Sequence, residues 1–114
     1  MKKVAIYLRI STRSQEDKFG LNSQLEGVNE YLRKTYPDYI GCVFQEQISG
    51  SSLIKPELEK AMGFAKENEC EVFMYGDDRF SRDLYVKLAT KLHFKEQGVR
   101  YIDVLMPITD DNPE

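Results

Sequence analysis

The sequence predicts a single α/β domain with three layers, in which helices cover both faces of a mostly parallel β-sheet. Apolar residues switch regularly along the chain between the short runs typical of strands and the spacing typical of helices. The chain has 114 residues, of which 41% are hydrophobic, and this is enough for one core. Strands separated by helices pair in parallel through right-handed crossovers. The expected order of elements is therefore βαβαβαβ.

The N-terminal part is predicted to contain a strand, a helix and a second strand. Residues 3–9 form a short apolar run that is typical of a strand. Apolar residues then recur at helical spacing, namely Leu21, Leu25, Val28 and Leu32. Pro37 follows and ends this helix, because proline cannot continue a helical hydrogen-bond pattern. The second strand is expected at about residues 40–44.

A second helix and a third strand are predicted next. Pro56 suits a first helical position, and Glu57 and Glu59 place negative charge in the first turn, where the helix dipole favours it. The apolar side of this helix is expected to consist of Leu58, Ala61, Met62 and Ala65. Residues 71–75 then form the predicted third strand.

The last predicted elements are a helix and a strand. The helix is expected to begin after Asp83 and to run to Gln97, with Gly98 as a left-handed terminator. Its leucines at helical spacing are Leu84, Leu88 and Leu92. The fourth strand is expected over residues 99–105.

Composition and charge limit the function of this domain. The net charge is −3, so no general positive field attracts a nucleic acid, and a polyanion must meet a local cluster of cations or be delivered by another domain. No apolar run approaches the length of a membrane span, and the chain begins with a strand rather than a signal peptide. We therefore expect a cytoplasmic protein that does not bind membranes. Residues 1–105 should form the domain, and the acidic residues 106–114 should fray.

The cysteines and the histidine do not indicate a metal site. Cys42 and Cys70 lie in or beside predicted strands and have neither the number nor the spacing of zinc ligands. We expect them to be buried free thiols. His93 lies inside a predicted helix and is expected to have no functional role.

Candidate functional residues follow the ends of three predicted strands. In open parallel sheets, ligands bind beyond the carboxyl ends of the strands. The segments that leave the first three strands are residues 10–20, 45–55 and 76–82. Because these strands point the same way, segments far apart in the sequence can share one cleft. The polar residues in or beside the first and third segments are Arg9, Ser11, Arg13, Asp78, Arg79 and Arg82.

This set of side chains suits attack of a serine on a phosphodiester. Guanidinium groups can neutralise the nonbridging oxygens of a phosphate while Ser11 attacks. Other interpretations remain open, because Ser11 could cap a turn, and Arg79 and Arg82 could pair with neighbouring aspartates on the surface. Arg13 suits either a phosphate contact or a solvated loop charge. Rival serines lie after the second strand, namely Ser49, Ser51 and Ser52, and Ser81 is expected to cap the third helix.

The order of these motifs resembles the catalytic domain of the serine recombinases, which include resolvases, DNA invertases and large integrases. The resemblance spans roughly residues 3–105. It rests on Tyr7-Leu8-Arg9-Ile10-Ser11-Thr12, Gln15, Leu21-Asn22-Ser23-Gln24, Ile48-Ser49-Gly50 and Asp78-Arg79-Phe80-Ser81-Arg82. The separation of Ser11 from Gln24 is more similar to large integrases and transposon recombinases than to small resolvases.

The resemblance implies a resolvase-like fold with flavodoxin-like strand order and a metal-free mechanism without a cofactor. Ser11 would form a 5′-phosphoserine intermediate with DNA, and the strands would then be exchanged and religated. Gln24 would position the site and Asp78 would orient arginines or handle a proton. The arginines that would grip the phosphate are Arg9, Arg79 and Arg82. The resemblance also implies a homodimer or tetramer in a full-length bacterial or phage-encoded enzyme, with DNA bound through additional domains.

Two departures from the family pattern keep alternatives open. Lys55 stands where the family usually has an arginine before the second helix, so the charge is kept and the bidentate fork is lost. The long helix that follows the fourth strand in the family is not in this sequence, which suggests a fragment of a longer recombinase. The alternatives are a degenerate recombinase domain that serves as an interaction module and an unrelated flavodoxin-like binding domain.

Overall fold

The protein folds as a four-stranded parallel sheet with helices on both faces, as the sequence predicted. A computed structural model of the chain describes residues 1–11, 20–49, 51–76, 81 and 83–106. The strands are β1 (Lys2–Ile10), β2 (Tyr39–Gln47), β3 (Val72–Met74) and β4 (Tyr101–Asp103), and the helices are α1 (Leu21–Thr35), α2 (Pro56–Asn68) and α3 (Leu84–Gln97). The sheet order is β2-β1-β3-β4, and every recorded strand pair is parallel. The second strand is longer than predicted, whereas the third and fourth are shorter.

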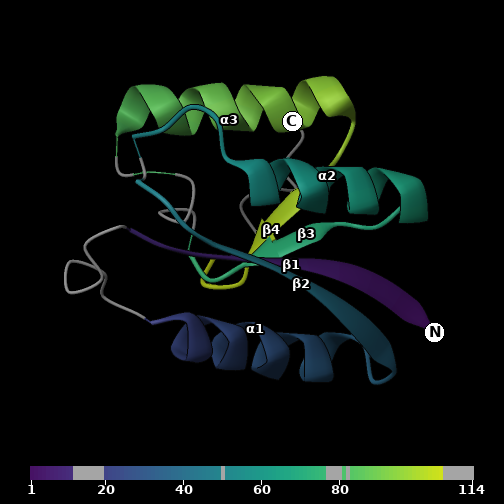
Figure 1. The fold of residues 1–114 in the computed structure, drawn as a ribbon. Helices are drawn as coiled ribbons and strands as arrows, with labels where there is room; N and C mark the ends of the chain where they lie inside the picture. The colour runs from purple at the N-terminus through teal and green to yellow at the C-terminus, as the bar shows by residue number, and fades with distance from the viewer. Residues whose placement is uncertain (12–19, 50, 77–80, 82, 107–114) are drawn as a thin grey trace.

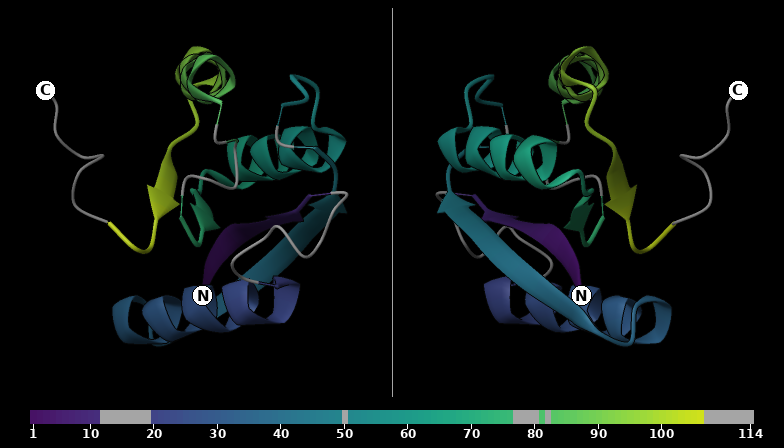
Figure 2. Two further views of the ribbon diagram at one scale, coloured as in Figure 1. Left: turned by 90° about the vertical axis from the view of Figure 1, so that its left-hand side faces the viewer. Right: turned by 90° about the vertical axis from the view of Figure 1, so that its right-hand side faces the viewer.

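The helices form two outer layers around the sheet. Helix α1 covers one face, and α2 and α3 cover the other (Figure 1). The two end views in Figure 2 show the same separation, with the sheet between the helical layers. This arrangement confirms the predicted three-layer class and gives the sheet two apolar cores.

Strand β1 is the centre of both cores. Val4, Ile6 and Leu8 pack with α1, and Ala5 and Tyr7 pack with α2 on the opposite face. All five side chains are at most 1% exposed. This burial explains the continuous apolar run of β1, because a parallel strand covered on both faces has no solvent-facing position.

The ends of the helices follow the predicted signals. Pro56 occupies the first position of α2, and Gly98 ends α3 in the left-handed conformation with φ 71°. The N-cap of α3 is Asp83, whose side chain accepts a hydrogen bond from the Val86 N–H at 3.3 Å. Ser81 was predicted to cap this helix. That prediction is wrong in detail, since the Ser81 hydroxyl accepts instead from the Asp83 N–H at 2.8 Å.

Helix α3 turns its leucine stripe towards solvent. Leu84, Leu88 and Leu92 are 67%, 55% and 55% exposed. The buried side of the helix is made by Val86, Thr90 and Phe94. The leucine spacing therefore predicted the helix correctly, but it does not mark the face that packs on the sheet.

The two thiols differ in their surroundings. Cys70 is buried, as expected, and its burial raises the pKa of its thiol. Cys42 is only half-buried, because it lies on the edge strand β2. In the part of the chain that the structure describes, no helix has the length and apolar character needed to cross a membrane.

Candidate active site at the carboxyl end of the sheet

The carboxyl ends of β1 and β2 lie side by side and form the base of the candidate site. Ile10 and Gln47 are paired in the sheet register, and the Ile48 N–H donates to the Ile10 carbonyl oxygen at 3.0 Å. The left view of Figure 2 looks at the molecule from this side. The described starts of the two segments that leave these strands, at Ile10 and Ile48, are therefore side by side, as the sequence predicted; residues 12–19 of the first segment lie outside the described residues.

Arg9 is a buried cation at this edge. Its side chain is on the face of β1 that carries Ala5 and Tyr7, and the residue is only 5% exposed. Its Nη1 donates to the carbonyl oxygen of Ile48 at 2.7 Å. A guanidinium has five donors, so a contact with one carbonyl does not exhaust its capacity for an anion. The loop after β2 therefore sets the position of the Arg9 side chain.

Gln24 holds the main chain of the same residue from the other face of the sheet. Its Nε2 donates to the Arg9 carbonyl oxygen at 3.0 Å, and its Oε1 accepts from the Arg9 N–H at 3.2 Å. The Gln24 side chain is fully buried in the first turns of α1. Its amide pairs with the peptide backbone of Arg9 as a neighbouring strand would. The end of β1 is consequently fixed from both faces.

Ser11 follows this fixed segment directly. It is the first residue after β1, it is half-buried, and it lies two residues beyond Arg9. The structure thus places the predicted nucleophile at the carboxyl end of the central strand, where a ligand of an open parallel sheet would bind.

Lys55 supplies a second buried cation near Arg9. It is the N-cap residue of α2 and is 2% exposed, and its Nζ donates to the carbonyl oxygen of Ser52. Burial lowers the pKa of the Lys55 ammonium, the positive charge of Arg9 lowers this pKa further, and the carboxylate of Glu46 opposes both effects. Lys55 therefore lies within electrostatic reach of Arg9.

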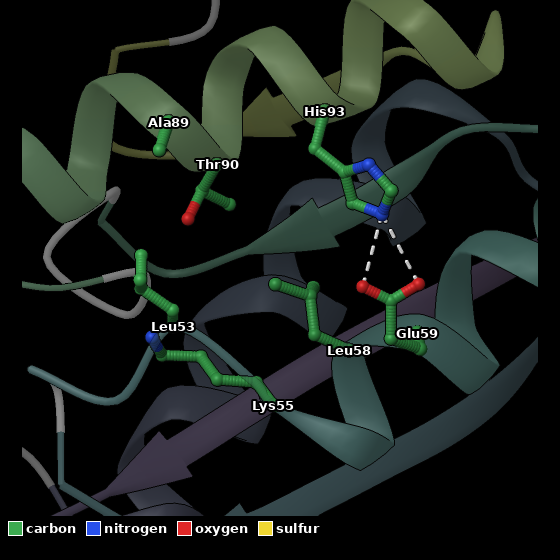
Figure 3. Close-up of a pocket in the computed structure, with 7 residues that line it drawn as sticks. All are labelled: Leu53, Lys55, Leu58, Glu59, Ala89, Thr90 and His93. Atoms are coloured by element: carbon green, nitrogen blue, oxygen red, sulfur yellow. Dashed lines mark hydrogen bonds and ion pairs between the residues drawn. The ribbon is translucent and has the colours of Figure 1, made fainter.

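A small cavity lies between Lys55 and helix α3. Its volume is about 70 Å³, and it is lined by Leu53, Lys55, Leu58, Glu59, Ala89, Thr90 and His93. In Figure 3 the ammonium of Lys55 lies on the side of Leu53, away from His93. His93 was expected to have no role, but its Nε2 lies 2.9 Å from Glu59 Oε2 and joins α3 to α2.

The third predicted segment is only partly described. Asp78, Arg79 and Arg82 lie outside the described residues, and so does Arg13. The start of the segment is set by Gly76, which has φ 91° and donates its N–H to Asp103 Oδ1 at 2.9 Å. A positive φ of this kind favours glycine because a Cβ would be strained there.

The serines after β2 are engaged within their own loop. The Ser49 and Ser51 hydroxyl oxygens are 2.9 Å apart, and the Ser52 hydroxyl donates to the Ile54 carbonyl oxygen at 2.9 Å. These contacts fit the interpretation of Ser49, Ser51 and Ser52 as loop residues rather than nucleophiles.

Glu46 is a site residue that the sequence analysis missed. The Tyr7 hydroxyl donates to Glu46 Oε2 at 2.5 Å, and the Glu57 N–H donates to Glu46 Oε1 at 3.1 Å. Glu46 is also the register partner of Arg9. The alternation of side chains along β2 could have revealed Glu46. Phe44 and Glu46 are two residues apart and therefore share the face towards α2.

Comparisons with known proteins agree with this geometry. The sequence matches the family described as "Resolvase, N terminal domain" over residues 4–114. The N-terminal catalytic domain of TP901-1 integrase has a similar structure, with 26% sequence identity, a TM-score of 0.71, and coverage of 94% of this chain and 80% of that chain. The C-terminal catalytic domain of ISC1926 TnpA, an IS607-like serine recombinase, shares the fold at 22% identity and a TM-score of 0.66, with coverage of 96% and 76%. The comparison with curated proteins gives no match.

Both neighbours are described as catalytic domains, and both share the fold of this chain over most of its length. The family match covers almost the whole chain, and it includes the strand end with Arg9 and Ser11. This chain belongs to the resolvase N-terminal domain family.

Proposed function

We propose that this domain is the catalytic domain of a site-specific DNA recombinase and that Ser11 is its nucleophile. The observation that carries the proposal is the position of Ser11 directly beyond Arg9, whose main chain is held by Gln24 and whose side chain lies near Lys55. A hydroxyl that follows a hydrogen-bonded strand end, two residues beyond the buried cation Arg9, suits attack on a phosphate, because positioning and charge neutralisation supply most of the catalysis in phosphoryl transfer.

The proposed reaction conserves the phosphodiester energy. The Ser11 oxygen forms a bond to phosphorus, the bond from phosphorus to the 3′ oxygen breaks, and the leaving oxygen ends as a 3′-hydroxyl after it gains a proton. The protein is then joined to the 5′-phosphate. In the reverse direction, a 3′-hydroxyl of another strand attacks this phosphoserine and releases Ser11. No metal ion or cofactor enters these steps.

Each cation has a proposed role in the transition state. Arg9 contacts the nonbridging oxygens from the end of β1, and Lys55 contacts them from the N-cap of α2. Arg79 and Arg82 complete the phosphate site from the segment after β3, and Asp78 orients them. A single arginine can contribute a factor of ~10³ to 10⁵ to the rate of phosphoryl transfer. Arg13 is proposed as a further contact to the DNA backbone.

Gln24 is proposed to act through the main chain rather than through the phosphate. Its two hydrogen bonds to Arg9 set the direction in which β1 ends, and therefore the position of Ser11. Gln24 is thus a positioning residue in this scheme. DNA is the proposed substrate, and assembly into a dimer or tetramer in the cytoplasm would bring the active sites together.

A second candidate function is an interaction module that has lost strand cleavage. The observation in its favour is Lys55, because a lysine cannot make the bidentate contact that an arginine makes with a phosphate. In this case the fold and the assembly surfaces would persist without formation of a covalent adduct.

Trapping of the covalent intermediate tests the proposal. The intact protein is incubated with a nicked duplex that carries its recombination site, and the adduct is detected by gel shift under denaturing conditions. We expect an adduct with the unmodified protein and with Ser49→Ala, and none with Ser11→Ala. An adduct that persists in Ser11→Ala would exclude Ser11 as the nucleophile, whereas a complete absence of adduct with the unmodified protein would favour the interaction module.

A further inference from the structure

Glu46 connects three elements beneath the candidate phosphate site. It extends from β2, accepts the Tyr7 hydroxyl of β1, and accepts the Glu57 N–H of the first turn of α2. Tyr7 is fully buried, so this carboxylate is drawn into the interface between the sheet and α2. Two donors from different elements therefore hold one carboxylate in a defined place.

The same carboxylate faces the two buried cations. Glu46 is paired with Arg9 in the register of β1 and β2, and it interacts electrostatically with Lys55. Lys55 immediately precedes α2, the helix whose first turn donates to Glu46. A change at Glu46 would therefore reach Lys55 both through its charge and through the start of α2.

We propose that Glu46 is a positioning residue that keeps Lys55 charged and beside Arg9, so that the pair can receive a phosphate. This inference rests on the proposed function of the site and deepens it. Glu46 does not contact the phosphate in this scheme, because its own negative charge would repel that group. It acts through Lys55.

The physical need for such a residue follows from burial. Moving an ammonium out of water disfavours its charged form, and a neighbouring guanidinium adds repulsion. Both effects lower the pKa of Lys55, and the negative charge of the Glu46 carboxylate raises it. Arginine at this position would not need the same support, since a guanidinium stays protonated in proteins. The lysine that departs from the family pattern is thus matched with a carboxylate.

Other charged groups near Lys55 come from each packed element. Arg9 faces it from β1 and Glu46 from β2, and Glu59 of α2 and His93 of α3 line the same cavity. Glu59 is engaged with His93 at 2.9 Å (Figure 3). Arg9 lowers the pKa of Lys55 and Glu46 raises it, so a titration of Lys55 should respond to removal of the Glu46 charge.

The first test measures Lys55 directly and needs no DNA. The side-chain Hε and Cε signals of Lys55 are followed by NMR as a function of pH in this chain and in its Glu46→Gln variant. We expect the midpoint of Lys55 to move to lower pH in Glu46→Gln, beyond the spread of repeat titrations. Glu67→Gln, which removes the same charge from the exposed far end of α2, should leave the midpoint in place. An unchanged or raised midpoint in Glu46→Gln would overturn the proposal.

A second variant covers the case in which Glu46→Gln does not fold. Glu46→Asp keeps the charge and shortens the side chain by one methylene, which draws the carboxylate away from its present position. We expect a smaller shift of the Lys55 midpoint in the same direction. A midpoint that stays unchanged in folded Glu46→Asp would reject the role of Glu46.

The third test links the residue to the reaction. The yield of the covalent DNA adduct is measured against pH in the intact protein. In Glu46→Gln, the alkaline limb of this profile should move to lower pH, because Lys55 loses its proton earlier. In a Lys55→Arg background, the same substitution should not move the limb, because the guanidinium does not titrate in this range. An equal movement in both backgrounds would show that Glu46 acts on another group.

The NMR titration and the adduct assay together distinguish failure of the inference from failure of the proposed function. If the unmodified protein forms no adduct, the proposed function fails, while the NMR titration still reports on the coupling of Glu46 and Lys55. If the adduct forms and the midpoint of Lys55 does not respond to Glu46, the recombinase function stands and the inference fails.

Discussion

Removal of the Gln24 side chain should destabilise the fold at the point where β1 ends. Gln24 is fully buried and makes two hydrogen bonds to the Arg9 main chain, at 3.0 and 3.2 Å. Each buried polar group that loses its partner costs about 1–3 kcal/mol. Gln24→Ala should therefore lower the free energy of unfolding by about 2–5 kcal/mol, once the cavity that it leaves is also counted.

Two further substitutions divide this cost into its parts. Gln24→Leu refills most of the volume and removes both hydrogen bonds, so it should remain destabilising by about 2 kcal/mol or more. Asn22→Ala removes an exposed amide from the same helix and should change the free energy of unfolding by less than about 0.5 kcal/mol.

Gln24→Glu adds a pH dependence whose sign can be stated. A carboxylate could accept from the Arg9 N–H but could not donate to the Arg9 carbonyl, and burial disfavours its charge, so the pKa of Glu at this position should be raised in the folded state. The folded state then binds more protons than the unfolded state. The variant should consequently lose stability as the pH rises from about 5 to 7, whereas the unmodified protein should not show this loss.

Urea unfolding followed by circular dichroism measures these free energies, with linear extrapolation to water. The reasoning would be refuted by Gln24→Ala and Gln24→Leu variants that are each within about 0.5 kcal/mol of the unmodified protein. It would also be refuted by a Gln24→Glu variant whose stability rises over the stated pH range.

Three further predictions concern the other described features of the site. Lys55→Ala should slow DNA cleavage more than it weakens DNA binding, and Lys55→Arg should retain or raise the rate. An equal loss of binding in the remote control Lys91→Ala would show that Lys55 has no specific role at the phosphate. Gly76→Ala should destabilise the fold by about 1–2 kcal/mol because of the positive φ, whereas Gly63→Ala in the middle of α2 should stabilise it by about 0.5–1 kcal/mol, as measured by urea unfolding. With a net charge of −3, the 114-residue chain should bind nonspecific duplex DNA weakly at physiological salt, and tight binding in a fluorescence anisotropy titration would contradict this charge argument.

Much of the fold was predictable because its signals are local. Pro56, Asp83 and Gly98 mark helix ends through fixed backbone preferences, and the apolar run of β1 marks a strand that is covered on both faces. The packed face of α3 was not predictable in the same way. Its buried face contains Thr90, which bonds to the Val86 carbonyl, while its leucines face solvent, so hydrophobicity alone points to the wrong side of the helix.

The residues of the candidate site also fall into those that the sequence could place and those that it could not. Ser11, Arg9 and Lys55 could be placed at one edge from the sequence, because parallel strands end together. Gln24 was recognised by resemblance, but its mode of action through the main chain of Arg9 depends on the approach of α1 to β1. Glu46 was missed for a similar reason. Its importance comes from the register of β1 with β2 and from the N–H of Glu57, and neither is visible in a single strand.

The strand that leads into Ser11 is one of the two interior strands of the sheet. Strands β2 and β3 flank β1 at its two edges, and helices cover both of its faces. Its amide protons can therefore exchange with solvent only when a large part of the domain opens. The end of β1 next to Ser11 is paired with β2 and bonded by Gln24 of α1, so the geometry around Ser11 should persist on heating for as long as both β2 and α1 stay in place. Loss of activity at temperatures below global unfolding should begin in the segments that pack against the end of β1 from other elements.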